Sequence, residues 1–290
     1  MFDTDVCRSL LFVPAGNARY LDSAIRGPAD VLQIDLEDAI APNGKADARA
    51  SAAEDIQRIS AAGRVGAVRV NTHPDLLEQD LETAVTHATA ALTIPKVDSA
   101  DSLLSIDERV TALESDRGLQ LGGIRLIAQI ESAAGVLNAR EIAQSTGRLA
   151  AMGIGMEDLA TEIGGQVTEN ALYFPNMQIL YAAREAGVVP IGYPGSIAVY
   201  DDTDTFRAWI QKAASLGFSG GFCIHPRQVD ILNEGFTPKE EEIAAYRLLV
   251  EAAATYEHEG QGVFIHDGKM VDKPVVDRAR QVLARWEKLQ

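Results

Sequence analysis

Two acidic side chains are placed where they could share a metal ion. Glu131 directly follows the apolar run IRLIAQI, and Asp158 lies shortly after the apolar run LAAMGIG. If these runs form neighbouring parallel strands, their carboxylates meet at one rim of the sheet. Two oxygen ligands with room for waters suit Mg²⁺ or Mn²⁺. The sequence therefore indicates a divalent-metal site, with a solvated loop residue or a helix cap as the alternative for either acid.

Arg69 is the basic side chain best placed to act on an anion. It lies inside the apolar run AVRVN, where a nearly buried guanidinium needs a negative partner. That partner is either negative charge developing on a substrate or a carboxylate of the protein, Asp35 or Glu37. Both interpretations stay open at this point.

Two further polar residues follow predicted strands but have simpler explanations than catalysis. Lys96 follows Pro95 and could form a Schiff base, yet no specific signature surrounds it, so a salt bridge is the better interpretation. His225 ends another apolar run, and a packing or loop-capping role is the better interpretation for it.

Eight short apolar runs would position these residues. Each is nearly continuously apolar, as expected of parallel strands covered on both faces. They are RSLLFVP from Arg8, VLQIDLE from Val31, AVRVN from Ala67, ALTIPK from Ala91, IRLIAQIE from Ile124, LAAMGIG from Leu149, VVPIGYP from Val188 and GGFCIHP from Gly220.

Helical segments separate these runs, and three of them end at Gly63, Gly187 and Gly217. The predicted helices are Asn17 to Arg26, Gly44 to Ala62, Leu76 to Ala88, Ala100 to Glu114, Ala133 to Ser145, Asn176 to Ala186 and Asp204 to Leu216. Eight strand and helix units in succession predict an α/β fold, a (β/α)8 TIM barrel, over residues 1–236. An open doubly wound sheet is the alternative.

Residues 237–290 are predicted to form a C-terminal extension that a barrel does not need for closure. A helix is expected from Pro238 to about Glu259 and another from Val275 to Leu289. Between them, FIHDGKMV brackets an Asp-Gly turn signal and predicts a hairpin. This helical and hairpin extension is interpreted as a lid or an oligomer contact.

Composition excludes several classes of function. The 290 residues carry 26 Lys and Arg against 42 Asp and Glu, a formal charge of −16, which disfavours binding to nucleic acid or to an anionic membrane. Two cysteines form no framework, and no apolar stretch approaches a membrane span, so a cytoplasmic protein is expected. Phosphate-loop, nucleophile-elbow and complete dinucleotide-binding motifs are absent from the sequence.

Several segments resemble one known family. They are RSLLFVPAGN, DVLQIDLEDAIAPNGKADAR, VRVN, IPKVDSADSL, LIAQIESAAGVLNAREIA, GIGMEDLATEIGG, GFSGGFCIHPRQVDILNEGF and DGKMVDKPVVDRAR. In this order they are similar to the citrate lyase beta subunit-like (CitE-like) branch of the HpcH/HpaI aldolase/citrate lyase superfamily. The resemblance implies a Mg²⁺-dependent carbon–carbon lyase that acts on short β-hydroxyacyl-coenzyme A thioesters such as citramalyl-, malyl- or citryl-CoA.

The resemblance also implies roles for individual residues. Glu131 and Asp158 would bind the metal, Arg69 would face the thioester carbonyl, and Asp272 would be the acid/base that a neighbouring subunit swings over the site. A homo-oligomer, a trimer or a multiple of one, is then expected. Basic residues near the coenzyme A phosphates would be Arg19, Lys45 and Arg49. Glu37 and Asp38 lie at a strand end suited to removing the substrate hydroxyl proton.

One departure and two rival functions accompany the resemblance. Many relatives place an Asp after the seventh strand where this chain has Gly192, and the loss is expected to reshape the acyl pocket. The first rival is an HpaI-type metal-dependent aldolase acting on free 2-oxo acids. The second is a non-catalytic subunit that binds coenzyme A or serves as a scaffold.

Overall fold

The structure is a computed structural model that describes residues 2–4, 6–258 and 262–290. It divides into two compact units, Met1–Phe236 and Thr237–Gln290. Within the described part of the chain, none of the helices combines the length and apolarity needed to span a membrane.

The first unit is built on a parallel eight-stranded sheet, ordered β7-β6-β5-β4-β3-β2-β1-β8. The strands are β1 (Ser9–Pro14), β2 (Val31–Asp35), β3 (Val65–Arg69), β4 (Ala91–Ile94), β5 (Arg125–Ile130), β6 (Leu149–Ile154), β7 (Val189–Ile191) and β8 (Gly221–Cys223). A parallel bridge between Ile191 and Gly220 joins the two ends of this order. The sheet is therefore closed, which confirms the predicted barrel and excludes the open doubly wound sheet.

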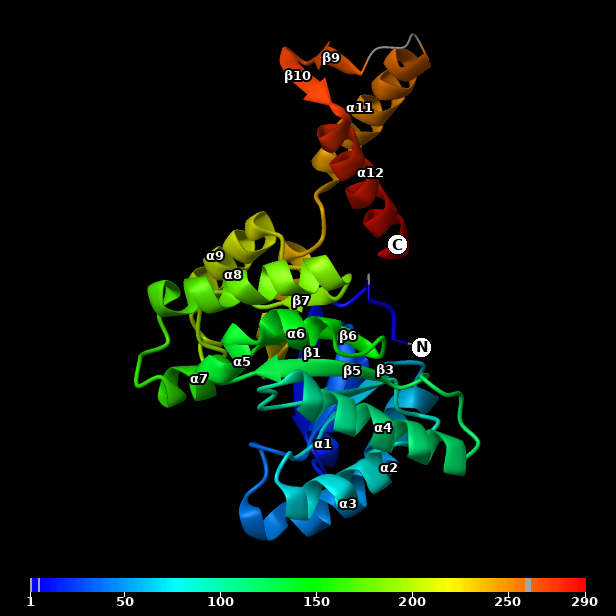
Figure 1. Cartoon of the computed structure of the whole chain (residues 1–290), viewed down its shortest axis with the longest axis vertical. Coiled ribbons are helices and arrows are strands. Elements are labelled where there is room, and N and C mark those ends of the chain that lie inside the picture. Colours follow the sequence, from blue (N-terminus) through cyan, green and yellow to red (C-terminus); the bar gives the residue numbers. More distant parts are fainter. Residues whose placement is uncertain (1, 5, 259–261) are drawn as a thin grey trace. The chain divides into compact units, whose positions relative to one another are not determined.

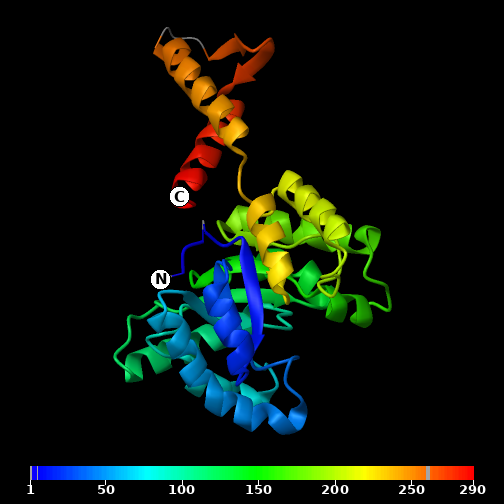
Figure 2. The same cartoon turned by 180° about the vertical axis from the view of Figure 1, so that it is seen from behind.

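Helices cover the outer face of the sheet, as the two opposite views show (Figures 1 and 2). They are α1 (Ala18–Arg26), α2 (Lys45–Ala61), α3 (Pro74–Ala84), α4 (Ala100–Asp116), α5 (Ala133–Leu137), α6 (Ala139–Gln144), α7 (Met156–Glu162), α8 (Glu169–Ala186), α9 (Thr203–Leu216) and α10 (Pro226–Gly235), with a 3₁₀ turn, η1 (Pro42–Gly44), before α2. Gly63, Gly187 and Gly217 have φ values of 71°, 71° and 110°. These left-handed glycines follow the ends of α2, α8 and α9, as predicted.

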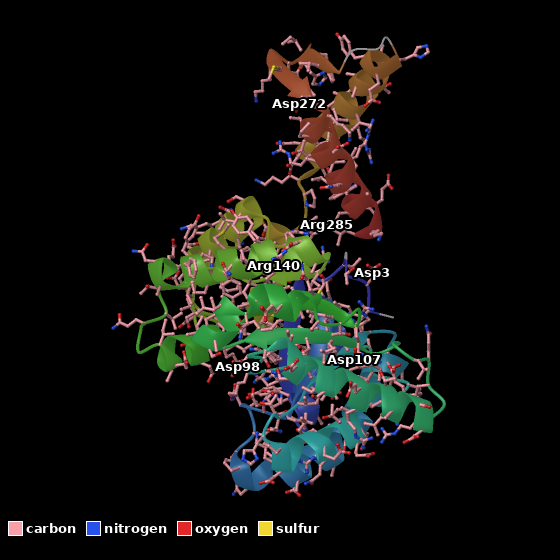
Figure 3. The ribbon with its side chains drawn as sticks, in the orientation of Figure 1. Asp3, Asp98, Asp107, Arg140, Asp272 and Arg285 are labelled. Carbon is pink, nitrogen blue, oxygen red and sulfur yellow. The ribbon has the colours of Figure 1, made fainter. Side chains whose placement is uncertain are left out.

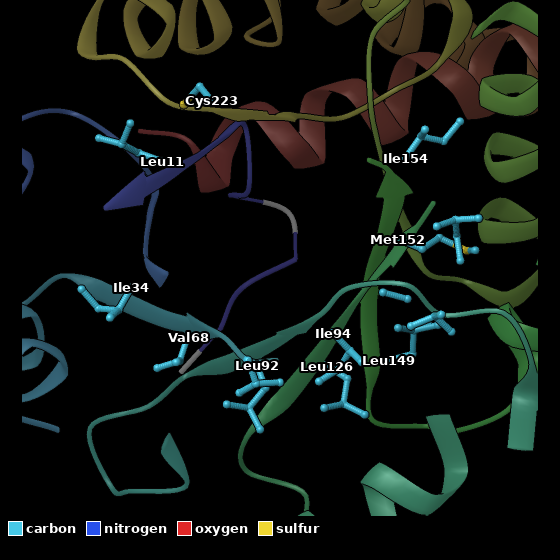
Figure 4. Packing of buried hydrophobic residues seen from close by; sticks show 14 of the residues in the cluster. Leu11, Ile34, Val68, Leu92, Ile94, Leu126, Leu149, Met152, Ile154 and Cys223 are labelled. Carbon is cyan, nitrogen blue, oxygen red and sulfur yellow. The ribbon is translucent and has the colours of Figure 1, made fainter. Parts of the chain in front are cut away.

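Side chains of the strands alternate between two apolar layers. Outward-facing residues such as Leu11, Ile34 and Val68 pack in the layer between sheet and helices (Figure 4). Residues one position away, such as Leu10 and Ala67, belong to a second cluster that fills the barrel interior. This period of two fixes which polar residues at the strand ends point inward.

The largest differences from the predicted helix bounds lie in three segments. The segment from Ala133 to Ser145 is two helices, because Asn138 interrupts it and its side chain donates to the carbonyl of Asp98 (2.8 Å). Helix α8 starts at Glu169 rather than Asn176 and runs through Pro175, and α3 ends at Ala84. Helices α7 and α10 are not among the predicted helices.

The second unit consists of α11 (Glu240–His258), the hairpin β9 (Val263–His266) and β10 (Lys269–Asp272), and α12 (Lys273–Lys288). Asp267 and Gly268 both have positive φ, 47° and 72°, as the predicted Asp-Gly hairpin turn requires. Phe264 stacks on Tyr256 of α11 with ring centroids 4.5 Å apart. The predicted helix end at Glu259 lies outside the described residues, as do positions 260 and 261 of the predicted loop.

Candidate active site at the carboxyl ends of the barrel strands

Alternation along the strands turns four polar side chains toward the barrel axis. Val31, Ala67 and Ile127 belong to the interior cluster. Counting onward by twos, Asp35 ends β2, Arg69 ends β3, and Gln129 and Glu131 end β5, all on the inner face. Asp35 and Arg69 are direct partners in the pairing of β2 with β3. The strand register therefore gathers these residues at one end of the barrel.

Arg69 is held by three carboxylates. Its Nε and Nη2 donate to the two oxygens of Asp35 at 2.8 and 2.7 Å, and Nη1 lies 3.2 Å from carboxylate oxygens of both Glu37 and Asp38. The guanidinium also lies over the Phe12 ring, 4.4 Å from its centroid. Burial opposes the charge, but the hydrogen bonds and charges of Asp35 outweigh it and raise the pKa of Arg69. The internal salt bridge considered from the sequence is confirmed.

Asp35 also shapes the loop that follows β2. Besides binding Arg69, its carboxylate accepts hydrogen bonds from the backbone N–H groups of Glu37 (2.9 Å) and Ala39 (3.1 Å). These bonds fix the backbone on both sides of Asp38. The two candidate bases of this loop are thereby positioned relative to the guanidinium.

Lys96 forms the predicted salt bridge, and its partner is Glu37. Its backbone is left-handed, with φ 54°, which is uncommon for a residue with a side chain. Burial raises the pKa of Glu37, while the charges of Arg69 and Lys96 act against that rise. Burial opposes the charge of Lys96, but the hydrogen bond that Lys96 donates to Glu37 and the negative charge of Glu37 outweigh it and raise the pKa of Lys96.

Glu131 is a buried carboxylate whose oxygens have no hydrogen-bond partner. The residue is 3% exposed, and both Oε1 and Oε2 are buried and unpaired. Burial, with the negative charges of Glu37 and Asp158, raises the pKa of Glu131 to about 8. A Cβ atom on Gly155 would lie 2.5 Å from Oε1 of Glu131, so glycine makes room for this carboxylate. A carboxylate in this position calls for a cation.

The residues present fit a divalent metal ion held by two carboxylates. In addition to the two Glu131 oxygens, Gln129 Oε1 is a buried oxygen without a hydrogen bond. Asp158, at the start of α7, is half-buried and lines the neighbouring pocket. Across the described residues, no three or more His, Cys, Asp or Glu side chains gather as a metal site. Two protein ligands completed by water are typical of Mg²⁺.

A pocket of about 800 Å³ opens beside these residues. Asp35, Asp38, Arg69, Gln129 and Asp158 line its polar part. Its apolar part is formed largely by side chains from β1 and from the ends of β6 and β8, namely Leu11, Phe12, Val13, Ile154, Met156, Phe222 and Ile224. A pocket with mostly apolar walls and a few convergent polar groups is the usual form of a small-molecule site.

The three predicted phosphate-binding residues do not lie together. Arg19 is exposed and lines the pocket, and so does Arg26, which sequence reasoning missed. Arg19 and Arg26 are seven residues apart on α1 and therefore lie on one helix face. This spacing could have identified Arg26 from the sequence.

Lys45 and Arg49, the other two residues predicted to lie near the coenzyme A phosphates, make internal contacts in the structure. Lys45 donates to the carbonyls of residues 36 and 37 (2.9 and 2.7 Å) and to Asn71 (2.8 Å), which uses all three of its donors. Arg49 binds Asp80 (2.7 Å) and Gln79 (3.0 Å). Neither residue lines the pocket. The structure gives them the role of joining α2 to neighbouring segments.

His225 caps a helix, as the sequence indicated. Its Nδ1 accepts a hydrogen bond from the backbone of Arg227 (3.2 Å) at the start of α10. Its ring stacks on Tyr200 with centroids 4.9 Å apart, and it lines the pocket.

Gly192 directly follows β7. A Cβ atom there would lie 2.6 Å from Oδ1 of Asn176 on α8 and 3.2 Å from the ring of Phe218. A side chain built on this backbone would therefore meet the layer around α8. The effect of Gly192 on the acyl pocket stays a prediction.

Asp272 belongs to the second unit, at the junction of β10 and α12 (Figure 3). It is the N-cap of α12, and its carboxylate accepts from the backbone N–H of Val275 at 3.4 Å. The second carboxylate oxygen remains available to another group.

Comparison with known proteins assigns the chain to a family. The family model described as HpcH/HpaI aldolase/citrate lyase matches residues 8–226. The chain belongs to this family.

Members of the family with named activities align over almost the whole chain. The citrate lyase subunit beta of Escherichia coli is 38% identical, covering 97% of this chain and 93% of that protein. The L-malyl-CoA/beta-methylmalyl-CoA lyase of Cereibacter sphaeroides is 30% identical, with coverages of 97% and 94%. The resemblance drawn from the sequence motifs, including its assignment to a family with lyases, is confirmed.

A solved family structure is also similar. CitE from Mycobacterium tuberculosis, in complex with magnesium, acetoacetate and coenzyme A, is 26% identical with a TM-score of 0.73, covering 96% of this chain and 97% of that one.

Proposed function

We propose that this protein is a Mg²⁺-dependent carbon–carbon lyase that cleaves a short β-hydroxyacyl-CoA thioester. The observation that carries the proposal is the Glu131 carboxylate, which is buried with both oxygens unpaired and lies within electrostatic reach of Asp158 and Arg69. The named lyase relatives and the magnesium and coenzyme A in the CitE complex support the choice of metal and substrate class. Mn²⁺ would serve the same donor set.

The metal would be held by Glu131 and Asp158, and when bound it would chelate the substrate hydroxyl and carboxylate and lower the pKa of that hydroxyl. Glu37 and Asp38 are the candidates for taking the hydroxyl proton. Asp38 lines the pocket and its side chain is 53% exposed, whereas Glu37 is paired with Lys96 and Arg69. The exposed carboxylate is the better placed of the two to meet a substrate.

Loss of the hydroxyl proton allows the adjacent carbon–carbon bond to break. The bonding electrons pass to the carbon next to the thioester carbonyl, giving a 2-oxo acid and an enolate of acetyl-CoA. Arg69 would stabilise the enolate oxygen, because its charge is fixed in place before the reaction begins. Asp272 would then give its proton to the enolate carbon, which yields acetyl-CoA. In the synthetic direction Asp272 would act as the base.

The coenzyme A portion requires local positive charge on a protein with a net charge of −16. Arg19 and Arg26 on α1 line the pocket and are exposed, so we assign the phosphates to them. Asp272 lies in the second compact unit, and we propose that it acts on the site of a neighbouring subunit in a homo-oligomer, a trimer or a multiple of one. Cys7 and Cys223 are buried and are not joined in a disulfide, which supports a reducing, cytoplasmic setting.

The test is a substrate panel assayed with Mg²⁺ for released acetyl-CoA or oxo acid. It should contain malyl-, citramalyl-, methylmalyl- and citryl-CoA together with aldol adducts of free 2-oxo acids. We expect turnover of at least one thioester, its loss in EDTA, and its recovery on adding Mg²⁺. Turnover of the free adducts alone would instead indicate an HpaI-type aldolase. Binding of acetyl-CoA without any turnover would indicate a non-catalytic subunit.

A further inference from the structure

Two loops that are distant in sequence form one wall of the pocket. The loop between β7 and α9 contributes Ile197, the turn between β8 and α10 contributes Ile224 and His225, and α10 contributes its first residue, Pro226. Ile197 also packs against the apolar cluster of the barrel interior. This wall therefore borders both the pocket and the apolar barrel interior.

One buried amide side chain joins the two loops. Gln228 is 1% exposed and does not line the pocket. Its Oε1 accepts from the backbone N–H groups of Ile224 (3.0 Å) and His225 (3.1 Å). Its Nε2 donates to the backbone carbonyls of Ile197 (2.9 Å) and Val199 (3.3 Å). Both donors and both acceptor sites of the amide are used, half of them on each loop.

Contacts on either side extend the same wall. Tyr200 of the first loop stacks on His225 of the second, with ring planes 21° apart. Ser196 hydrogen-bonds Glu157, the residue before the candidate metal ligand Asp158. The wall is thus connected at one end to the candidate metal site.

We propose that Gln228 is a positioning residue that holds the wall formed by Ile197 and His225, and that it thereby sets the affinity for the thioester. The proposal rests on the proposed function. Gln228 touches none of the residues assigned to the reaction, so its loss weakens binding of substrate and transition state alike. The expected effect is a higher KM with an unchanged kcat.

Two substitutions distinguish the hydrogen bonds that the amide oxygen accepts from those that the amide nitrogen donates. Gln228→Glu keeps the acceptor for Ile224 and His225 but removes both donors to the loop that carries Ile197. Gln228→Met has a similar length and removes all four hydrogen bonds. Thr111→Val is the matched control, because it deletes a hydrogen bond from Arg148 (2.7 Å) that does not involve pocket residues.

For both Gln228 variants we expect KM for the best thioester to rise about tenfold, while kcat stays within about twofold of wild type. Amide hydrogen exchange of the substrate-free protein gives a second readout. Exchange in residues 194–201 should rise in both variants, and exchange at the amides of Ile224 and His225 should rise only in Gln228→Met. Thr111→Val should change neither KM nor these two segments.

The proposal is overturned by unchanged exchange in residues 194–201 of soluble, folded Gln228→Glu. It is also overturned by a fall in kcat with KM unchanged, since that would place Gln228 in the chemical step. Failure of the proposed function has a different signature, namely that wild type turns over no thioester. In that case the exchange pattern still decides whether Gln228 holds the wall.

Discussion

At the scale of single residues, the unpaired carboxylate of Glu131 makes a prediction about pH. Its pKa is raised to about 8, against 4.5 when exposed. Between these values the folded, metal-free protein keeps the proton that the unfolded chain has lost, so stability falls as pH rises from about 4.5 to 8. Within this range the free energy of unfolding falls by at most about 1.4 kcal/mol for each pH unit.

Glu131→Gln removes this penalty. In EDTA, the Tm of the variant minus the Tm of wild type should be larger at pH 8 than at pH 5, by about 5 °C or more. Adding Mg²⁺ at pH 8 should raise the Tm of wild type and leave the variant unchanged. A Tm difference that is the same at every pH would show that Glu131 is ionised in the metal-free fold.

Arg69→Lys tests whether the fixed guanidinium matters beyond its charge. Lysine cannot reproduce the paired hydrogen bonds to Asp35 and the contacts to Glu37 and Asp38 at the same time. We expect kcat to fall about 100-fold or more and stability to fall by about 2–4 kcal/mol. The measurements are steady-state kinetics and urea unfolding.

Arg140→Lys is the control for this substitution. Arg140 makes a similar pair of hydrogen bonds, to Glu185 (2.8 and 2.7 Å), but on an exposed surface. Its variant should match wild type in both measurements, because exposed ion pairs contribute little. If Arg140→Lys lowered kcat and stability as much as Arg69→Lys, burial of the guanidinium would not explain the effect at Arg69.

The sequence predicted the inward residues because strand periodicity is local. Glu131 and Arg69 follow from counting by twos along an apolar run. Lys45 and Arg49 could not be assigned in the same way, since their acceptors Asn71 and Asp80 lie on segments about 30 residues away. Only the folded chain brings those acceptors to the start of α2.

At the scale of elements, the turn from β6 to α7 must approach the end of β5 closely. Gly155 lies in this turn, and its Cβ would clash with Glu131. Gly155→Ala should displace the carboxylate, lower kcat about tenfold or more and weaken apparent Mg²⁺ affinity, as measured by activity against Mg²⁺ concentration.

Gly147→Ala is the matched control for that variant. A Cβ on Gly147 meets no atom within 4 Å, and its backbone does not need glycine. The control should therefore bind Mg²⁺ like wild type. If Gly155→Ala keeps wild-type Mg²⁺ dependence, the carboxylate of Glu131 is not constrained by this turn.

The boundaries of helices and strands show where local sequence patterns no longer predict the structure. The eight strands could be predicted from continuous apolar runs, because a strand in a sheet that is covered on both faces needs apolar side chains on both sides. The break at Asn138 depends on a hydrogen bond to Asp98, 40 residues away, and no local signal carries it. The predicted start of α8 at Asn176 is too late. The helix continues through Pro175 despite the missing backbone N–H, because buried neighbours such as Leu172 and Ile179 stabilise it.

At the scale of the whole molecule, the candidate reaction divides between two compact units. The proposed metal ligands, Glu131 and Asp158, belong to residues 1–236, and Asp272 belongs to residues 237–290. The hairpin that carries Asp272 exposes Val263, Ile265 and Met270, an apolar surface on a segment with its own small core. Such a surface needs a partner when the enzyme works.

Mixing two inactive variants tests whether that partner is another copy of the chain. Glu131→Gln lacks a metal ligand and Asp272→Ala lacks the proton donor, so each homo-oligomer should be inactive. In a mixed oligomer, an Asp272 from one subunit can act on an intact metal site of another, and activity should return to about a quarter of wild type if assembly is random in trimers or dimers. Mass spectrometry of differently tagged subunits verifies that mixing occurred. Activity that stays absent in verified mixed oligomers would place Asp272 and Glu131 of one chain in the same site.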